Sequence, residues 1–96
     1  MKMAYCRFFD DPPTCYSVAE DTYIVSQGTI ATGGEGSKEE SIKRWNWIIK
    51  EIRRLKITIQ ELLDDWRVGE DWEDFFGRKE SEQDHIAGVG NMVKAQ

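Results

Sequence analysis

Residues 37–66 read SKEESIKRWNWIIKEIRRLKITIQELLDDW, and they carry a helical pattern. Ser37 and Glu40 form a capping box at its start, because the Ser37 hydroxyl can accept from the Glu40 N–H. Apolar residues recur in two neighbouring rows along this helix. The apolar stripe is therefore broad, which favours packing on a sheet over a two-stranded coiled coil. The main row occupies positions 42, 45, 49, 52, 59, 63 and 66.

Two features divide this pattern near residue 56. Lys56 stands where the next apolar residue of the main row belongs, and Thr58 with Glu61 forms a second potential capping box. A single helix over 38–67 would be about 45 Å long, more than a small sheet can cover. We therefore expect an amphipathic helix over about 38–67 and favour a break near 56, giving helices over 38–55 and 59–67, with the unbroken helix as the alternative.

The chain before the helix, over about 3–31, is rich in aromatic and β-branched residues, which favour strands. Turn signals at 10–13 and 20–21 divide it. Gly28 indicates a bulge or an early end of the last strand. The fold class that follows is α+β, in which the helix packs on a three-stranded antiparallel β-meander with strands at 3–9, 14–19 and 22–31.

Two cysteines, Cys6 and Cys15, flank the first turn signal. In a hairpin centred between Asp10 and Asp11 they would face each other across the strands, where a disulfide is sterically feasible. The favoured alternative is a pair of free thiols in a reducing compartment. Since the N-terminus also has no apolar signal segment, we expect a cytoplasmic protein.

The composition indicates one small folded domain. The chain has 96 residues with a net charge of −5, and 40% of its residues are hydrophobic, too many for a disordered chain. No apolar run is long enough for a membrane-spanning helix. We expect a single α+β domain over 1–77 and a polar, disordered tail over 78–96. So small a core favours a dimer or a bound partner.

Charge is segregated along the chain, which is the best indication of function. Residues 38–56 carry seven basic and three acidic side chains, or +4, whereas residues 57–76 carry one basic and seven acidic side chains, or −6. The acidic segment could neutralise the basic helix within one molecule, or two molecules could pair basic half to acidic half in a homodimer. In the third alternative both charged surfaces face outward and meet partners.

The third alternative predicts a non-catalytic, inhibitor-like protein-binding module. Its acidic-aromatic surface would meet a basic site, such as a nucleic-acid-binding site, on a partner protein, because aromatic side chains supply contact area and carboxylates steer the encounter. The rings could equally close the domain's own core. The candidate partner-binding residues are Asp64, Asp65, Glu70, Asp71, Trp72, Glu73, Asp74, Phe75 and Phe76.

The alternative function is a small nucleic-acid-binding regulator that uses the basic helix over 43–56. Cationic side chains there could contact phosphates, although the acidic net charge of the chain opposes steering toward a polyanion. Nucleic acid is therefore the less favoured partner. The candidate residues are Lys43, Arg44, Lys50, Arg53 and Arg54.

The residue types that carry enzymatic chemistry do not form a recognisable set. His85 is the only histidine, and it lies in the polar tail. The Gly-rich stretch 32–38 lacks the spacing of a phosphate-binding loop. The carboxylates do not have the spacing of a calcium or zinc site. We therefore expect no enzymatic activity, no catalytic residue, no metal and no cofactor.

Overall fold

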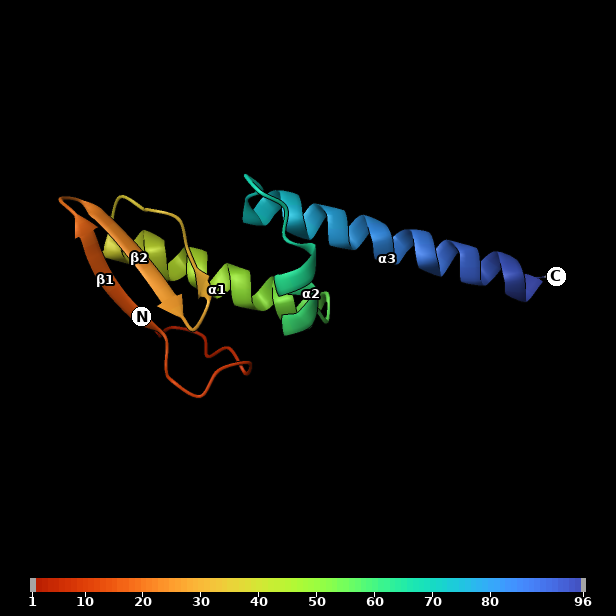
Figure 1. Ribbon diagram of the computed structural model, residues 1–96, viewed down its shortest axis with the longest axis horizontal. Helices are drawn as coiled ribbons and strands as arrows, with labels where there is room; N and C mark the ends of the chain where they lie inside the picture. Colours follow the sequence, from red (N-terminus) through yellow and green to blue (C-terminus); the bar gives the residue numbers. More distant parts are fainter. Residues whose placement is uncertain (1, 96) are drawn as a thin grey trace. The chain divides into compact units, whose positions relative to one another are not determined.

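The computed structural model describes residues 2–95, with side chains described as far as residue 84. It has an α+β fold with three strands followed by three helices (Figure 1). The chain divides into two compact units, residues 1–51 and 52–96. The sequence predicted one domain over 1–77, so the division falls inside that range, within the first helix.

The sheet of the N-terminal unit is an antiparallel meander in the order β1-β2-β3. Its strands are β1 (Thr14–Ala19), β2 (Thr22–Gln27) and β3 (Ile30–Ala31). Gly28, at φ 59°, turns the chain between β2 and β3. A Cβ there would lie 2.3 Å from the Phe9 ring, so both the backbone and the space require glycine. The early strand end that Gly28 indicated is therefore confirmed.

The strand predicted over 3–9 is wrong, because residues 2–13 form no strand. Side chains from other elements bind the backbone groups that a strand ladder would need. Gln27 accepts from the Cys6 N–H (2.9 Å) and donates to the Cys6 carbonyl (3.0 Å). Asn46 accepts from the Ala4 N–H (2.7 Å), while the Trp45 indole donates to the Ala4 carbonyl (2.7 Å).

The cysteine hairpin consequently does not form, and Cys6 and Cys15 are both free thiols. Cys6 belongs to the irregular N-terminal segment, and its side chain is buried. Cys15 lies on β1 with its Sγ 3.4 Å from the Ser41 hydroxyl of the first helix. The structure therefore agrees with the free thiols of the second alternative.

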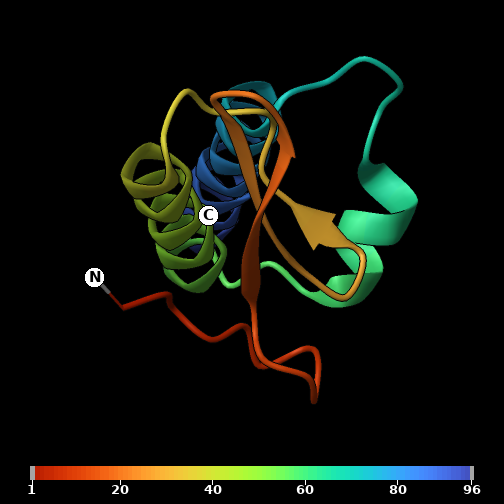
Figure 2. The ribbon, with the colours of Figure 1, turned by 90° about the vertical axis from the view of Figure 1, so that its left-hand side faces the viewer.

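Helix α1 (Lys38–Arg54) covers one face of the sheet (Figure 2). Ser37 caps it as expected, accepting from the Glu40 N–H at 3.1 Å. The predicted apolar stripe points inward, and its burial supplies the main stabilisation of this unit. The core of the N-terminal unit consists of Cys6, Val25, Ile30, Ile42, Trp45, Ile48 and Ile49.

The predicted break near residue 56 is confirmed. Lys56 adopts a positive φ of 54°, and the Ile57 N–H bonds back to the Ile52 carbonyl (3.0 Å), which ends α1 in a Schellman-type turn. Thr58 then caps α2 (Ile59–Asp65) by accepting from the Glu61 N–H at 3.1 Å. The second capping signal thus begins a new helix.

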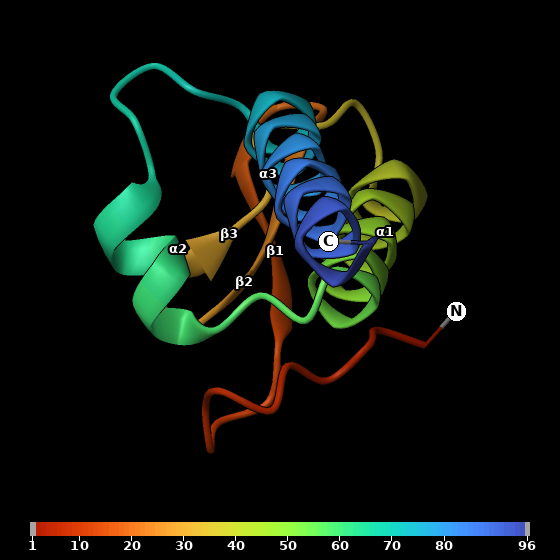
Figure 3. The ribbon, with the colours of Figure 1, turned by 90° about the vertical axis from the view of Figure 1, so that its right-hand side faces the viewer.

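Helix α3 (Trp72–Ala95) follows the loop that leads on from α2 (Figure 3). Asp71 caps its start by accepting from the Asp74 N–H at 2.8 Å. The stretch over 78–96, expected as a disordered tail, is helical as far as Ala95. Its first turns contain ion pairs at helical spacing, such as Arg78 with Glu82 at 3.6 Å, which support a helix in a polar sequence.

Replacing Gln27 tests the origin of the irregular N-terminal segment. Gln27→Ala removes the two hydrogen bonds that the Gln27 amide forms with the buried Cys6 N–H and carbonyl, so the free energy of unfolding should fall by about 2–3 kcal/mol. Urea denaturation followed by circular dichroism measures the loss.

The matched control is Ser26→Ala, the neighbouring residue on β2, which should change stability by no more than about 0.5 kcal/mol. Equal stability of the two variants would show that Gln27 does not anchor the segment.

Candidate functional site

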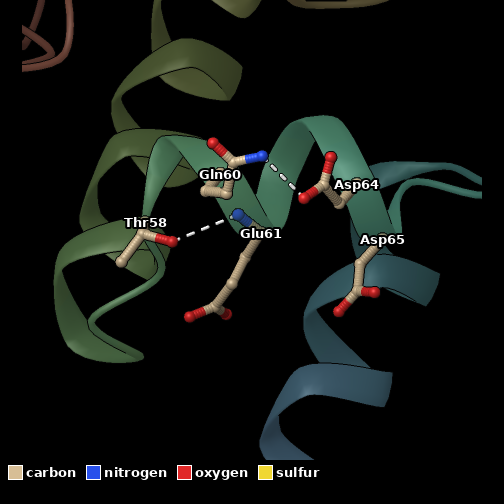
Figure 4. Close-up of a pocket in the computed structure, with 5 residues that line it drawn as sticks. All are labelled: Thr58, Gln60, Glu61, Asp64 and Asp65. Carbon is tan, nitrogen blue, oxygen red and sulfur yellow. Dashed lines mark hydrogen bonds between the residues drawn. The ribbon is translucent and has the colours of Figure 1, made fainter.

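An acidic hollow on α2 is the most distinctive surface of the C-terminal unit. Its volume is about 270 Å³, and three of its lining side chains are carboxylates. Gln60 donates to Asp64 (2.6 Å) along the helix, so one wall of the hollow has a fixed geometry. Figure 4 shows the residues that line it, which are Thr58, Gln60, Glu61, Asp64 and Asp65.

Lys79 of α3 supports this hollow with one buried positive charge. Only 5% of its side chain is exposed, and its ammonium pairs with Asp65, with Glu61 at 3.7 Å and with Glu82 at 3.4 Å. Burial acts to lower the pKa of Lys79, but the hydrogen bonds to Asp65 and Glu82 outweigh it and leave the pKa raised. The same hydrogen bond lowers the pKa of Asp65. Both groups are therefore charged at neutral pH.

Arg78, the neighbour of Lys79, fixes the loop between α2 and α3. Its guanidinium donates to both carboxylate oxygens of Glu70, at 2.8 and 3.0 Å, and to the Asp65 carbonyl at 2.6 Å. Glu70 also accepts from the Arg67 N–H, and only 7% of its side chain is exposed. The hydrogen bond from Arg78 lowers the pKa of Glu70, and Glu70 raises that of Arg78.

The four aromatic side chains of this region pack together, with three of them buried and Trp66 half-buried. Phe75 is fully buried, Phe76 and Trp72 nearly so, and Trp66 lies 4.7 Å from Trp72 and 5.0 Å from Phe75 between ring centroids. Trp72, Phe75 and Phe76 therefore form the core of the C-terminal unit and are not available as a contact surface. The sequence left open whether these rings form a contact surface or close the domain's own core, and the structure shows the second arrangement.

The carboxylates around these rings stay on the surface. Asp64, Asp65, Asp71, Glu73 and Asp74 are exposed. Asp71 and its acidic neighbours raise the pKa of Asp74. Of the nine predicted partner-binding residues, five are thus exposed carboxylates, one is the Glu70 carboxylate held by Arg78, and three are core rings.

The basic candidates lie along α1. Lys43, Lys50, Arg53 and Arg54 are exposed. Arg44 is half-buried with its guanidinium 4.6 Å from the Trp47 ring centroid. Arg54 forms an exposed ion pair with Glu80 of α3 at 3.2 Å.

Three lining residues of the hollow, Thr58, Gln60 and Glu61, and the two cations beside it were not among the sequence candidates. Glu61 belongs to the lining, while Arg78 and Lys79 lie in the stretch expected to be disordered. A usable signal existed in the spacing of Arg78 and Lys79 from Glu82, which is i, i+4 and i, i+3 on a helix. No pattern of neighbouring residues predicts that these cations pair with Glu61, Asp65 and Glu70, because the partners lie far from them in the sequence.

Comparison with protein-family models, with curated proteins and with solved structures finds no match to this chain. Within the part of the chain that the structure describes, no helix is both long enough and apolar enough to cross a membrane. Over the same residues, no three His, Cys, Asp or Glu side chains gather as a potential metal site. His85 lies beyond the residues whose side chains are described.

Replacing Phe75 tests whether the rings are core. Phe75→Ala removes a fully buried side chain that contacts Trp66, Trp72 and Phe76. The free energy of unfolding should therefore fall by about 3–5 kcal/mol. Urea denaturation followed by tryptophan fluorescence and circular dichroism measures the change.

Leu63→Ala on α2 is the control, because Leu63 is 60% exposed. It should alter stability by no more than about 0.5 kcal/mol. A Phe75→Ala protein as stable as the wild type would instead mean that the ring is available for contacts with partners.

Proposed function

We propose that the protein is a small, non-catalytic, inhibitor-like binding module whose C-terminal unit presents an acidic surface to a basic site on a partner protein. The partner-facing residues are the exposed carboxylates of α2 and of the start of α3. Trp72, Phe75 and Phe76 stabilise that surface from within. The two free thiols suit a reducing compartment such as the cytoplasm, where we expect the partner.

The observation that carries the proposal is the charge balance of the α2 hollow. Glu61, Asp64 and Asp65 line it, and Lys79 is the cation that pairs with its walls. Lys79 is shared with Glu82, Arg78 is paired with Glu70, and Arg67 is the third cation that acts on Asp65. Five carboxylates against three cations leave an excess of negative charge around the open hollow. A guanidinium or ammonium group of a partner would neutralise that excess.

The fixed geometry of the hollow also favours binding. Gln60 holds Asp64, Lys79 holds Asp65, and Arg78 holds the loop that follows α2 through Glu70. Side chains that are already positioned lose less conformational entropy when a partner binds. The surface therefore combines electrostatic attraction with preorganisation.

Nucleic-acid binding by α1 is the second candidate function. Lys43 and Lys50 support it, because they are exposed and lie two helical turns apart on the same face. Arg54 and Arg44 contribute less, since the first is paired with Glu80 and the second contacts Trp47. The acidic module ranks first because its charged groups are gathered around a defined hollow.

The proposal can be tested by neutralising the hollow. A protein with Glu61→Gln and Asp64→Asn loses two negative charges from its walls. Its affinity for a fluorescein-labelled peptide of eight arginines at low salt should fall by about tenfold, measured by fluorescence anisotropy.

The matched control carries Glu35→Gln and Glu39→Gln, which remove the same net charge from the N-terminal unit. Its affinity for the peptide should stay close to that of the wild type. If both double variants lose the same affinity, net charge and not the hollow governs binding, and the proposal fails. Binding of mixed-sequence RNA by the wild type at physiological salt would favour the second candidate.

A further inference from the structure

The outer edge of β1 exposes backbone groups in a regular arrangement. In β2, Val25 accepts from the Thr32 N–H (2.9 Å), and Tyr23 exchanges two hydrogen bonds with Glu35 (2.8 and 2.9 Å). The backbone groups of Val25 and Tyr23 therefore point away from β1, and those of the alternate β2 residues point toward it.

The register of the two strands then fixes the orientation of each β1 residue. Tyr16 and Thr14 lie opposite Ile24 and Ser26 and bond to β2, whereas Cys15 lies opposite Val25 and Ser17 opposite Tyr23. The N–H and C=O groups of Cys15 and Ser17 consequently point outward from the sheet. Within the described chain, β1 has a neighbouring strand on its β2 side alone.

β1 lacks two of the features that commonly protect an edge strand, namely charged side chains and proline. Its sequence, TCYSVA, contains neither a charged residue nor a proline. Tyr16 is 46% exposed and Val18 50% exposed, so apolar side chains flank the outward backbone groups. The pairing of β1 with β2 becomes irregular between Ser17 and Ala19. The outward backbone groups of Cys15 and Ser17 lie before this irregularity, where the pairing is regular.

The ends of β1 are acidic, and this charge determines which kind of strand could pair with its outer edge. Asp10 and Asp11 precede the strand, and Glu20 and Asp21 follow it, all four exposed. A second copy of the chain would bring these carboxylates against carboxylates, whether its β1 lay antiparallel or parallel. Like charges therefore oppose self-pairing, and a strand with basic residues at both ends is complementary.

We propose that β1 accepts an extended segment of a partner protein as a fourth strand of the sheet. The segment has an uncharged core of β-branched residues flanked by lysine or arginine at both ends. Its backbone bonds to Cys15 and Ser17, its apolar side chains cover Tyr16 and Val18, and its basic ends meet the four carboxylates. The inference concerns the N-terminal unit and does not depend on the acidic hollow of the C-terminal unit.

The probe is the fluorescein-labelled peptide KKTVTVTKK, whose binding to the whole protein is followed by fluorescence anisotropy. Ser17→Pro removes the outward N–H without touching the ladder to β2, and its ring obstructs an added strand. Its affinity should fall by at least about tenfold. Ser17→Ala is the matched control, because it keeps the N–H and removes the same side-chain hydrogen bond to Ala19, and it should bind like the wild type.

Two further peptides test the inference on the wild-type protein alone. EETVTVTEE should bind at least about tenfold more weakly, because its ends repel the carboxylates. KKTPPPTKK, which keeps the charge and cannot complete a strand ladder, should also bind at least about tenfold more weakly. In the complex with KKTVTVTKK, the Cys15 and Ser17 amides should exchange hydrogen more slowly.

The inference is overturned if KKTVTVTKK does not bind, or if KKTPPPTKK binds equally well, since charge alone would then explain the affinity. Equal binding by folded Ser17→Pro protein overturns it as well. Because the hollow variant Glu61→Gln/Asp64→Asn leaves β1 intact, it should bind KKTVTVTKK normally. Failure of the acidic hollow to bind the arginine peptide is therefore distinguishable from failure of strand addition.

Discussion

Two adjacent cations on α3, Arg78 and Lys79, govern the C-terminal unit. Residues 57–76 carry seven carboxylates and one arginine, so they would repel one another if brought together without counter-charges. Arg78 pairs with Glu70, and Lys79 with Asp65 and Glu61. These pairs hold α2 and the following loop over the rings of α3, as the contacts of both cations with Phe75 also indicate. The acidic surface thus depends on a partly compensated charge cluster.

The parts of the fold that the sequence predicted correctly are those set by local interactions. The Ser37 and Thr58 caps, the apolar stripe of α1 and the break at Lys56 each depend on residues a few positions apart. Capping and periodicity are properties of a short stretch, so one sequence suffices to recognise them. Gly28 belongs to the same class, because its turn follows from its own backbone freedom.

The errors come from side chains that act across the chain. Gln27 and Trp45 bind the backbone of residues 4–6, and this competes with the strand that the aromatic residues over 3–9 favoured. Similarly, Lys79 pairs with Asp65 fourteen residues earlier, so the stretch read as a disordered tail is structured at its start. The aromatic composition of the acidic segment is compatible both with a protein core and with a contact surface. The burial of Trp72, Phe75 and Phe76 in the structure decides for the core.

The most direct test of this account is amide hydrogen exchange of α2 as a function of pH, with the Leu62 N–H, bonded to the Thr58 carbonyl, as the reporter. The pKa values of Asp65 and Glu70 are lowered in the folded protein, so their pairs stabilise it fully above the ordinary carboxyl pKa and less as the pH falls. Protection of Leu62 should therefore be high at neutral pH and decline between about pH 5 and about pH 3. Exchange of Leu62 at the rate of an unfolded peptide at neutral pH, or protection unchanged across that range, would contradict the account.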